Sequence, residues 1–340
     1  MTNIEIGGSR IGWGYSPIVV AELSANWKDL QVACDVVNLA KQTGANALKT
    51  QCYSFDTITV PNDIIIDRGR WKGQSYQKLY QDAAMPREWN VELADEARRI
   101  GIGFFSTPFS EYDADWLEEH IAPICYKIAS FEIVDLPLIE HVAKIGKPII
   151  LSTGMATMLE IERAVEILKR NSIPFALLHC NSSYPAKEEE LDLRRMELLS
   201  FYDCPVGFSD HTRGNTAAIA AIALGANIIE KHFNPYPENE TPDSEFSMPP
   251  TVFGKMVRDI RLTEAMLRPR ELDKNNPSMQ YRPSLWVVQD IKAGEKFTPD
   301  NIKSLRPNLG MEIRKYWNIL ETVAAVDIPA NTPLTKEMVA

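Results

Sequence analysis

The stretch that decides the fold spans residues 205–233 and reads PVGFSDHTRGNTAAIAAIALGANIIEKHF. Two short apolar runs flank an alanine-rich helical segment from Thr216 to Leu224. This order predicts a β-strand, an α-helix and a second strand that lies parallel to the first. A histidine stands just past the apolar part of each strand, His211 on the first and His232 on the second. Ligands of parallel α/β proteins bind at the carboxyl ends of the strands, so we expect both histidines at a site.

Two imidazoles at the same height on neighbouring strands can share one divalent ion. The alternative is a pair of structural histidines that bind no ligand, and for either residue alone this alternative is favoured. Here both occupy matching positions and each lies close to a carboxylate in the sequence, Asp210 and Glu230. The pattern therefore favours a metal site formed by His211 and His232.

Six further apolar runs of strand length precede this stretch, at residues 17–23, 45–51, 103–107, 124–129, 148–152 and 175–180. Helical patterns alternate with the strands, at 31–43, 86–99, 110–120, 136–144, 157–170, from about 194, at 216–224 and at 251–267. Eight β-then-α units predict an α/β protein with a (β/α)₈ TIM barrel. An open doubly wound sheet is the alternative, and the lack of a GxGxxG turn weakens it.

The residue composition and pattern divide the chain into three parts. Residues 1–268 carry the barrel pattern, residues 269–284 are polar and predict a linker, and residues 285–340 show short β-like runs separated by turns. The last part predicts a small, mostly-β module near the lower size limit for independent stability. Within the barrel, residues 52–84 are too long for a bare connection and predict a functional loop.

Composition narrows the class of protein. The 340 residues are 45% hydrophobic and carry a formal net charge of −10, which argues against general nucleic-acid or membrane-surface binding. Five cysteines without a CxxC motif indicate a reduced, cytoplasmic protein. The first residues show no signal-peptide pattern, and no apolar run approaches the ~20 residues of a membrane span.

Polar side chains stand at the carboxyl end of every expected strand. They are Glu22, Asn26, Lys49, Gln51, Ser106, Thr107, Lys127, Ser130, Ser152, Thr153, His179, Asn181, Ser182, Ser183, Tyr184, Asp210, His211, Glu230 and His232. Two lysines with several hydroxyl and amide donors suit a phosphate or carboxylate. Together, these polar residues would form a ring around one mouth of the barrel, and this ring predicts metal-assisted chemistry on an anionic, carbonyl-bearing small molecule. The alternative for Lys49 and Lys127 is buried ion pairing with Glu22 or Glu132.

Many short motifs resemble those of the sialic-acid-type synthase family, on its pseudaminic acid branch. They are AELSAN (21–26), ALKTQ (47–51), FFSTPF (104–109), YKIASFE (126–132), STG (152–154), CNSSYPA (180–186), GFSDHT (207–212), IEKHF (229–233) and PDSEFS (242–247). The run DIKAGEKFTPDNIKSLRP, with AAVDIPANTPL after it, resembles the antifreeze-like (SAF) domain that these enzymes carry. The resemblance covers nearly the whole chain.

The resemblance implies condensation of phosphoenolpyruvate with the open-chain aldehyde of an N-acetylated, 2,4-diacetamido-trideoxy hexose. The products would be pseudaminic acid, a nine-carbon nonulosonic acid, and phosphate. It implies a divalent metal (Mn²⁺, Mg²⁺ or Co²⁺) on His211 and His232, with Glu22 as a further catalytic residue. Phosphoenolpyruvate would contact Lys49, Thr107, Lys127, Ser130, Ser152, Asn181 and Ser209. The sugar would contact Gln51, Tyr184, Asp243 and Arg306.

The same resemblance implies a domain-swapped homodimer, in which Arg306 reaches the barrel of a partner subunit. An ordinary surface arginine is the alternative. One segment departs from the family pattern, because Trp27-Lys28-Asp29 replaces the usual turn with histidine and glycine. The exact sugar therefore stays open. The alternatives are a synthase for N-acetylneuraminic or legionaminic acid, another metal-dependent aldol condensation, and a catalytically impaired sugar-binding homologue.

Overall fold

The computed structural model describes residues 2–69, 71–236, 242–269, 271, 273 and 275–340. It contains two compact units, Met1–Arg268 and Pro269–Ala340. Three residues of the predicted linker, at positions 270, 272 and 274, lie outside the described residues. Among the described residues, no helix combines the length and the apolar character needed to cross a membrane.

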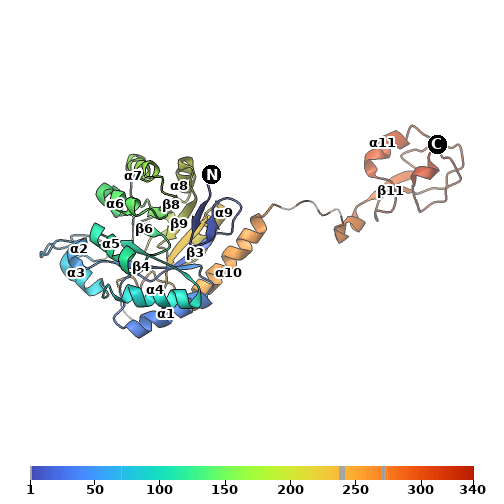
Figure 1. Cartoon of the computed structure of the whole chain (residues 1–340). Coiled ribbons are helices and arrows are strands. Elements are labelled where there is room, and N and C mark those ends of the chain that lie inside the picture. Colours follow the sequence, from blue (N-terminus) through green and yellow to red (C-terminus); the bar gives the residue numbers. More distant parts are fainter. Residues whose placement is uncertain (1, 70, 237–241, 270, 272, 274) are drawn as a thin grey trace. The chain divides into compact units, whose positions relative to one another are not determined.

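The first unit is a closed barrel of eight parallel strands, which confirms the predicted TIM barrel (Figure 1). The strands are β3 (Ile18–Glu22), β4 (Ala47–Cys52), β5 (Gly103–Pro108), β6 (Tyr126–Ile128), β7 (Ile149–Ser152), β8 (Phe175–Cys180), β9 (Val206–Asp210) and β10 (Ile228–His232). Pairing between β10 and β3 closes the ring, with Ile228 opposite Ile18 and His232 opposite Glu22. All eight strands expected from the sequence are present.

Helices surround the strands in Figure 1. They are α1 (Leu30–Gln42), α4 (Trp89–Ile100), α5 (Glu111–His120), α6 (Leu136–Ile145), α7 (Met158–Arg170), α8 (Arg195–Leu199), α9 (Thr216–Ala223) and α10 (Pro250–Leu267). Capping side chains fix where such helices begin. At α7, for example, Thr157 and Glu160 form a capping box that satisfies the free backbone N–H groups of the first turn. The excursion after β4 contains two further helices, α2 (Phe55–Ile58) and α3 (Tyr76–Ala83).

The strand residues form two apolar layers. Outward-facing side chains such as Leu48, Phe104 and Leu177 pack against the helices in the larger core. Inward-facing side chains such as Val20, Phe105 and Ile150 fill the amino-terminal half of the barrel. Farther along the same strands the inward positions become polar, so the carboxyl end of the barrel holds the candidate site.

An antiparallel hairpin that the sequence did not predict precedes the barrel. Its strands are β1 (Ile4–Ile6) and β2 (Ser9–Ile11). Ile4, Ile6 and Ile11 are buried in the same cluster as the inward-facing residues of the amino-terminal half. The hairpin therefore fills the barrel end opposite the polar one.

The second unit is a small domain with antiparallel strands, as the sequence predicted. Strand β11 (Ser284–Val287) pairs with β12 (Ile302–Leu305) on one side and with β13 (Thr332–Pro333) on the other. The unit also contains the short helix α11 (Tyr316–Ile319). Leu285, Ile302 and Phe297 belong to its own small apolar core.

Candidate active site

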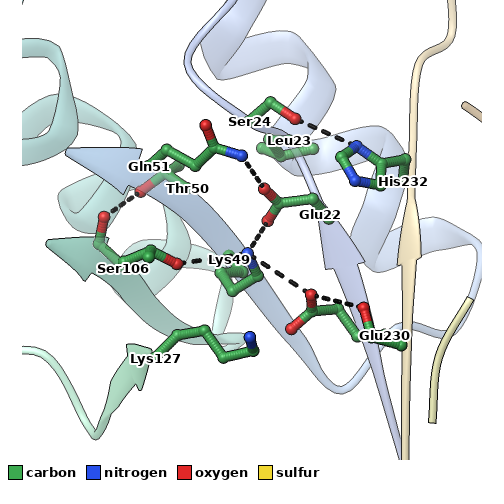
Figure 2. A network of polar contacts seen from close by, with 12 residues as sticks. Glu22, Leu23, Ser24, Lys49, Thr50, Gln51, Ser106, Lys127, Glu230 and His232 are labelled. Atoms are coloured by element: carbon green, nitrogen blue, oxygen red, sulfur yellow. Dashed lines mark hydrogen bonds and ion pairs between the residues drawn. The ribbon is translucent and has the colours of Figure 1, made fainter. Parts of the chain in front are cut away.

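A buried network of charged residues lies at the carboxyl end of the barrel (Figure 2). The Lys49 amine on β4 lies 2.9 Å from Glu22 Oε2 on β3 and 3.6 Å from Glu230 Oε1 on β10. It also donates to the Thr107 hydroxyl at 3.4 Å. Gln51 donates to the other Glu22 oxygen at 3.0 Å. The alternative of ion pairing between Lys49 and Glu22 is therefore found in the structure.

Burial changes the protonation of these groups. It raises the pKa of Glu22 to about 7, because an ion loses its hydration there and the attraction of Lys49 offsets only part of that loss. Burial opposes charge on Glu230 as well, but Lys127 and Lys49 bring its pKa below the usual range. Burial also disfavours the charged form of Lys49, and Glu22 and Glu230 outweigh it and raise its pKa. One carboxyl of the network is thus able to exchange a proton near neutral pH.

Lys127 on β6 lies beside this network in Figure 2. Its amine donates to the Ser152 hydroxyl at 2.7 Å and to the Ile128 carbonyl at 3.0 Å. These bonds, rather than the expected alternative of an ion pair with Glu132, hold the amine in the described part of the chain. Burial lowers the pKa of Lys127. Its charge is therefore costly where it stands, and an anion next to it would stabilise that charge.

Small residues form a close-fitting cradle next to Ser152. Gly154 has a φ of +45°, and a Cβ placed on it would lie 2.5 Å from both Ser130 Cβ and Ser182 Oγ. The Ser130 and Ser182 hydroxyls are 2.9 Å apart. A glycine is therefore required here, because any side chain would displace the two hydroxyls.

The two histidines predicted as metal ligands meet at the same mouth. Their ring centroids are 5.7 Å apart. The Asn181 carbonyl lies 2.7 Å from Nδ1 of His211, and because a carbonyl only accepts, Nδ1 carries the proton and Nε2 keeps its lone pair. Nδ1 of His232 lies 3.2 Å from the Ser24 hydroxyl.

Both imidazoles are uncharged near neutral pH. Burial lowers the pKa of His211 to about 4. Burial, followed by repulsion from His211, brings the pKa of His232 well below its usual value. Neutral imidazoles are the form that binds metals.

The donor set fits a divalent ion that retains open positions. Among the described residues no three His, Cys, Asp or Glu side chains converge as a closed metal cage. Two neutral imidazoles instead share the mouth with Glu230, whose Oε2 is buried and has no hydrogen-bond partner. Two neutral imidazoles leave coordination positions open to other ligands, and an open coordination shell is typical of catalytic metals.

The predicted sugar-binding residues divide between the two units. Tyr184 lies over His211 with ring centroids 4.3 Å apart. Asp243 accepts from Asn26 at 2.7 Å and lies 3.8 Å from Nδ1 of His232. Arg306 is exposed in the second unit, just after β12. Tyr184 and Asp243 therefore lie beside the histidines and Gln51 lies beside Glu22, whereas Arg306 belongs to the other folded unit.

Asn181 and Ser209 act differently from a simple ligand contact. The side chain of Asn181 donates to the Glu190 carbonyl at 2.9 Å and accepts from the Ser183 amide at 2.8 Å. The Ser209 hydroxyl donates to Glu230 Oε1 at 3.1 Å. Asn181 thus already has local partners, and its backbone carbonyl orients His211.

The unusual segment at Trp27 is accommodated inside the fold. The indole is buried in the larger core, and its N–H donates to the Leu23 carbonyl at 2.8 Å. Asp29 caps α1 by accepting from the Val32 amide. A satisfied core tryptophan and a new helix cap therefore replace the turn that the family pattern predicts.

The sequence did not predict that Phe246 belongs to the site. Its buried ring packs against His232, with centroids 4.8 Å apart, and against Tyr184 at 5.2 Å. The motif PDSEFS contains it, but nothing in the local pattern distinguishes a phenylalanine over two histidines from an ordinary core residue.

Known proteins resemble the chain along its whole length. It is 41% identical to the pseudaminic acid synthase of Helicobacter pylori, across 94% of this chain and 97% of that protein. It is 33% identical to the N,N'-diacetyllegionaminic acid synthase of Campylobacter jejuni, across 90% of this chain and 95% of that protein. A crystal structure of N-acetylneuraminic acid synthetase from Leptospira borgpetersenii in complex with citrate has a TM-score of 0.74 and 32% identity. The match covers 82% of this chain and 94% of the Leptospira protein chain.

Sequence models of two families match the chain in succession. The NeuB family model spans residues 36–271, and the SAF domain model spans residues 282–340. Together with the barrel, the histidine pair and the related synthases, these matches show that the chain belongs to the NeuB family of sialic-acid-type synthases and ends in a SAF domain.

Proposed function

We propose that this chain is a phosphoenolpyruvate-dependent nonulosonic acid synthase. Its sugar substrate is the open-chain form of a 2,4-diacetamido-trideoxy hexose, and its products are pseudaminic acid and phosphate. The observation that carries the proposal is the convergence of two neutral imidazoles and a buried lysine–carboxylate network in one barrel mouth. The 41% identity to a pseudaminic acid synthase supports the choice of sugar.

The anionic substrate fits the side with the two lysines. Lys49 and Lys127 with the hydroxyls of Thr107, Ser130, Ser152 and Ser209 provide the donors that phosphate and carboxylate oxygens need. Asn181 joins this group through its position on the loop after β8. Lys49 pairs with two carboxylates, Glu22 and Glu230, and Lys127 adds a second positive charge nearby, so the charge of the network is nearly balanced. A bound cation would make the mouth positive and favour a highly charged enol phosphate.

His211 and His232 would hold the divalent ion, of which Mn²⁺, Mg²⁺ and Co²⁺ are candidates. When bound there, such an ion acts as a Lewis acid toward the oxygen of an aldehyde. The chain itself fixes the His211 ring by the bond to Asn181 and packs Phe246 against His232. The reaction joins C3 of phosphoenolpyruvate to the aldehyde carbon, adds the oxygen of water at C2, and breaks the bond between C2 and the phosphate oxygen.

Glu22 is suited to the proton transfers that this balance requires. Because burial raises its pKa to about 7, both of its protonation states are populated at neutral pH. It lies between Lys49, on the anion side, and Gln51, on the sugar side. A carboxyl in this place can deliver a proton to the new sugar hydroxyl or accept one from the attacking water.

The sugar would lie against Gln51, Tyr184 and Asp243 around the histidines. We further propose three functional parts, a catalytic barrel (1–268), a linker (269–284) and an antifreeze-like (SAF) domain (285–340). Arg306 of one subunit would contact the sugar in the barrel of its partner in a domain-swapped homodimer. The second unit buries only a small apolar core of its own, which supports a role that depends on a barrel.

Release of phosphate from phosphoenolpyruvate tests the proposal, in the presence of Mn²⁺ and each of several candidate hexoses. Turnover with a 2,4-diacetamido-trideoxy hexose of the stereochemistry of the pseudaminic acid precursor is expected. Preference for a legionaminic acid precursor would instead favour the second candidate, which the 33% identity to that synthase motivates. No turnover with any acetamido sugar would refute the proposal. Retention of full Mn²⁺-dependent turnover by His232→Ala would refute the metal assignment.

A further inference from the structure

A fully buried ion pair lies directly behind the two histidines. Lys231 Nζ is 3.0 Å from Asp210 Oδ2, and both side chains have 0% exposure. The two residues stand opposite each other where β9 pairs with β10. They follow Phe208 and Ile229, which face the larger apolar core between barrel and helices. Charged groups here stand in a layer that is apolar elsewhere on the same strands.

Such a pair needs a role beyond its mutual attraction. Moving two charges out of water is costly, and a hydrophobic pair of similar volume is often as stable. Among the described residues, the hydrogen bonds that this pair makes beyond its own ion pair lead to Thr212. Asp210 Oδ1 accepts from the Thr212 amide and from its hydroxyl, both at 2.8 Å. Lys231 donates to the Thr212 carbonyl, and its amine is 3.4 Å from the Thr212 hydroxyl.

These contacts hold the backbone that directly follows His211. Strand pairing ends at Ser209 toward β8 and at Asp210 toward β10, so His211 lies beyond the sheet on both sides. By contrast, His232 is still paired with Glu22. The cluster of Asp210, Thr212 and Lys231 therefore continues the link between the two histidine-bearing strands after the backbone pairing has stopped.

We propose that Asp210, Thr212 and Lys231 are positioning residues that set the separation of the His211 and His232 rings, and with it the affinity for a divalent cation. This inference rests on the proposed metal site. A purely structural role would lower the stability of the barrel and leave the cation affinity of the folded protein unchanged. Residues behind metal ligands typically change metal affinity by about 10- to 100-fold when replaced.

Binding of Mn²⁺ to the full chain, followed by the electron paramagnetic resonance signal of the free ion, tests the proposal. The double variant Asp210→Leu/Lys231→Met removes the side-chain contacts of both residues to Thr212 without leaving a buried charge unpaired. Its Kd for Mn²⁺ is expected to rise about 10- to 100-fold. Leu151→Ala is the matched control, because Leu151 is fully buried in the same layer on β7. The control should lose thermal stability and keep the wild-type Kd.

A folded double variant with the wild-type Kd would overturn the inference. If the double variant does not fold, Thr212→Val decides, because it removes only the hydroxyl contacts of the cluster; an unchanged Kd would then overturn the inference and a raised Kd would support it. Failure of the metal site itself is distinguishable, because wild-type protein and His211→Ala would then bind Mn²⁺ equally. If His211→Ala abolishes the Mn²⁺ binding of the wild type but the double variant keeps the wild-type Kd, only the positioning role is refuted.

Discussion

Replacing Glu22 by glutamine removes a carboxyl whose pKa burial raises from 4.5 to about 7. Between these values the folded protein holds a proton that the unfolded chain has released, so a rise in pH lowers the stability of the wild type. At about 1.4 kcal/mol per pH unit, the interval corresponds to roughly 3 kcal/mol of unfolding free energy. Glutamine does not titrate. The unfolding free energy of Glu22→Gln relative to wild type should therefore rise by about 3 kcal/mol between pH 4.5 and 7.5.

Urea unfolding of the metal-free protein, followed by tryptophan fluorescence at several pH values, measures this difference. Loss of the contact to Lys49 or Gln51 shifts the variant by a constant amount and leaves the pH dependence intact. Glu96→Gln is the control. The hydrogen bond from Arg99, more than any other contact, lowers the pKa of Glu96 to about 2, so its titration lies below this pH range. A difference between Glu22→Gln and wild type that stays constant with pH would refute the raised pKa.

Three further predictions address binding. Gly154→Ala should raise the KM for phosphoenolpyruvate at least about tenfold, since the new methyl group displaces Ser130 and Ser182; an unchanged KM in steady-state kinetics would contradict the cradle. Mn²⁺ affinity should fall less than about threefold between pH 7.0 and 5.5, because the pKa of His211 is about 4, whereas calorimetry showing a tenfold loss would indicate an ordinary imidazole. Arg306→Ala should raise the KM for the sugar but not for phosphoenolpyruvate, and equal changes in both would argue against a sugar contact.

The barrel was predictable because its strands are short, apolar and bounded by polar residues. Each of the eight apolar runs became a strand of the closed ring. The pairing of β10 with β3 follows from the same pattern, since a ring of eight has no free edge. The β1–β2 hairpin was not predictable, because strands of three residues are too short to show a period.

The site was predictable where strand position alone decides which way a side chain points. His211, His232, Lys49 and Glu22 meet because parallel strands end at one mouth. Contacts that depend on loops were hidden, and Asn181 illustrates this, because its carbonyl rather than its side chain meets His211. Trp27 shows the same limit, since a large side chain in a turn gives no sign of whether it faces the core or the substrate.

The β1–β2 hairpin closes the amino-terminal end of the barrel. Among the described residues, Ile4, Ile6 and Ile11 pack with the inward-facing strand residues and fill the end that faces away from the histidines, so a ligand of the histidine site approaches from the carboxyl end of the barrel. Whatever enters must leave by the same route. A molecule seated beneath another stays confined until the upper one departs.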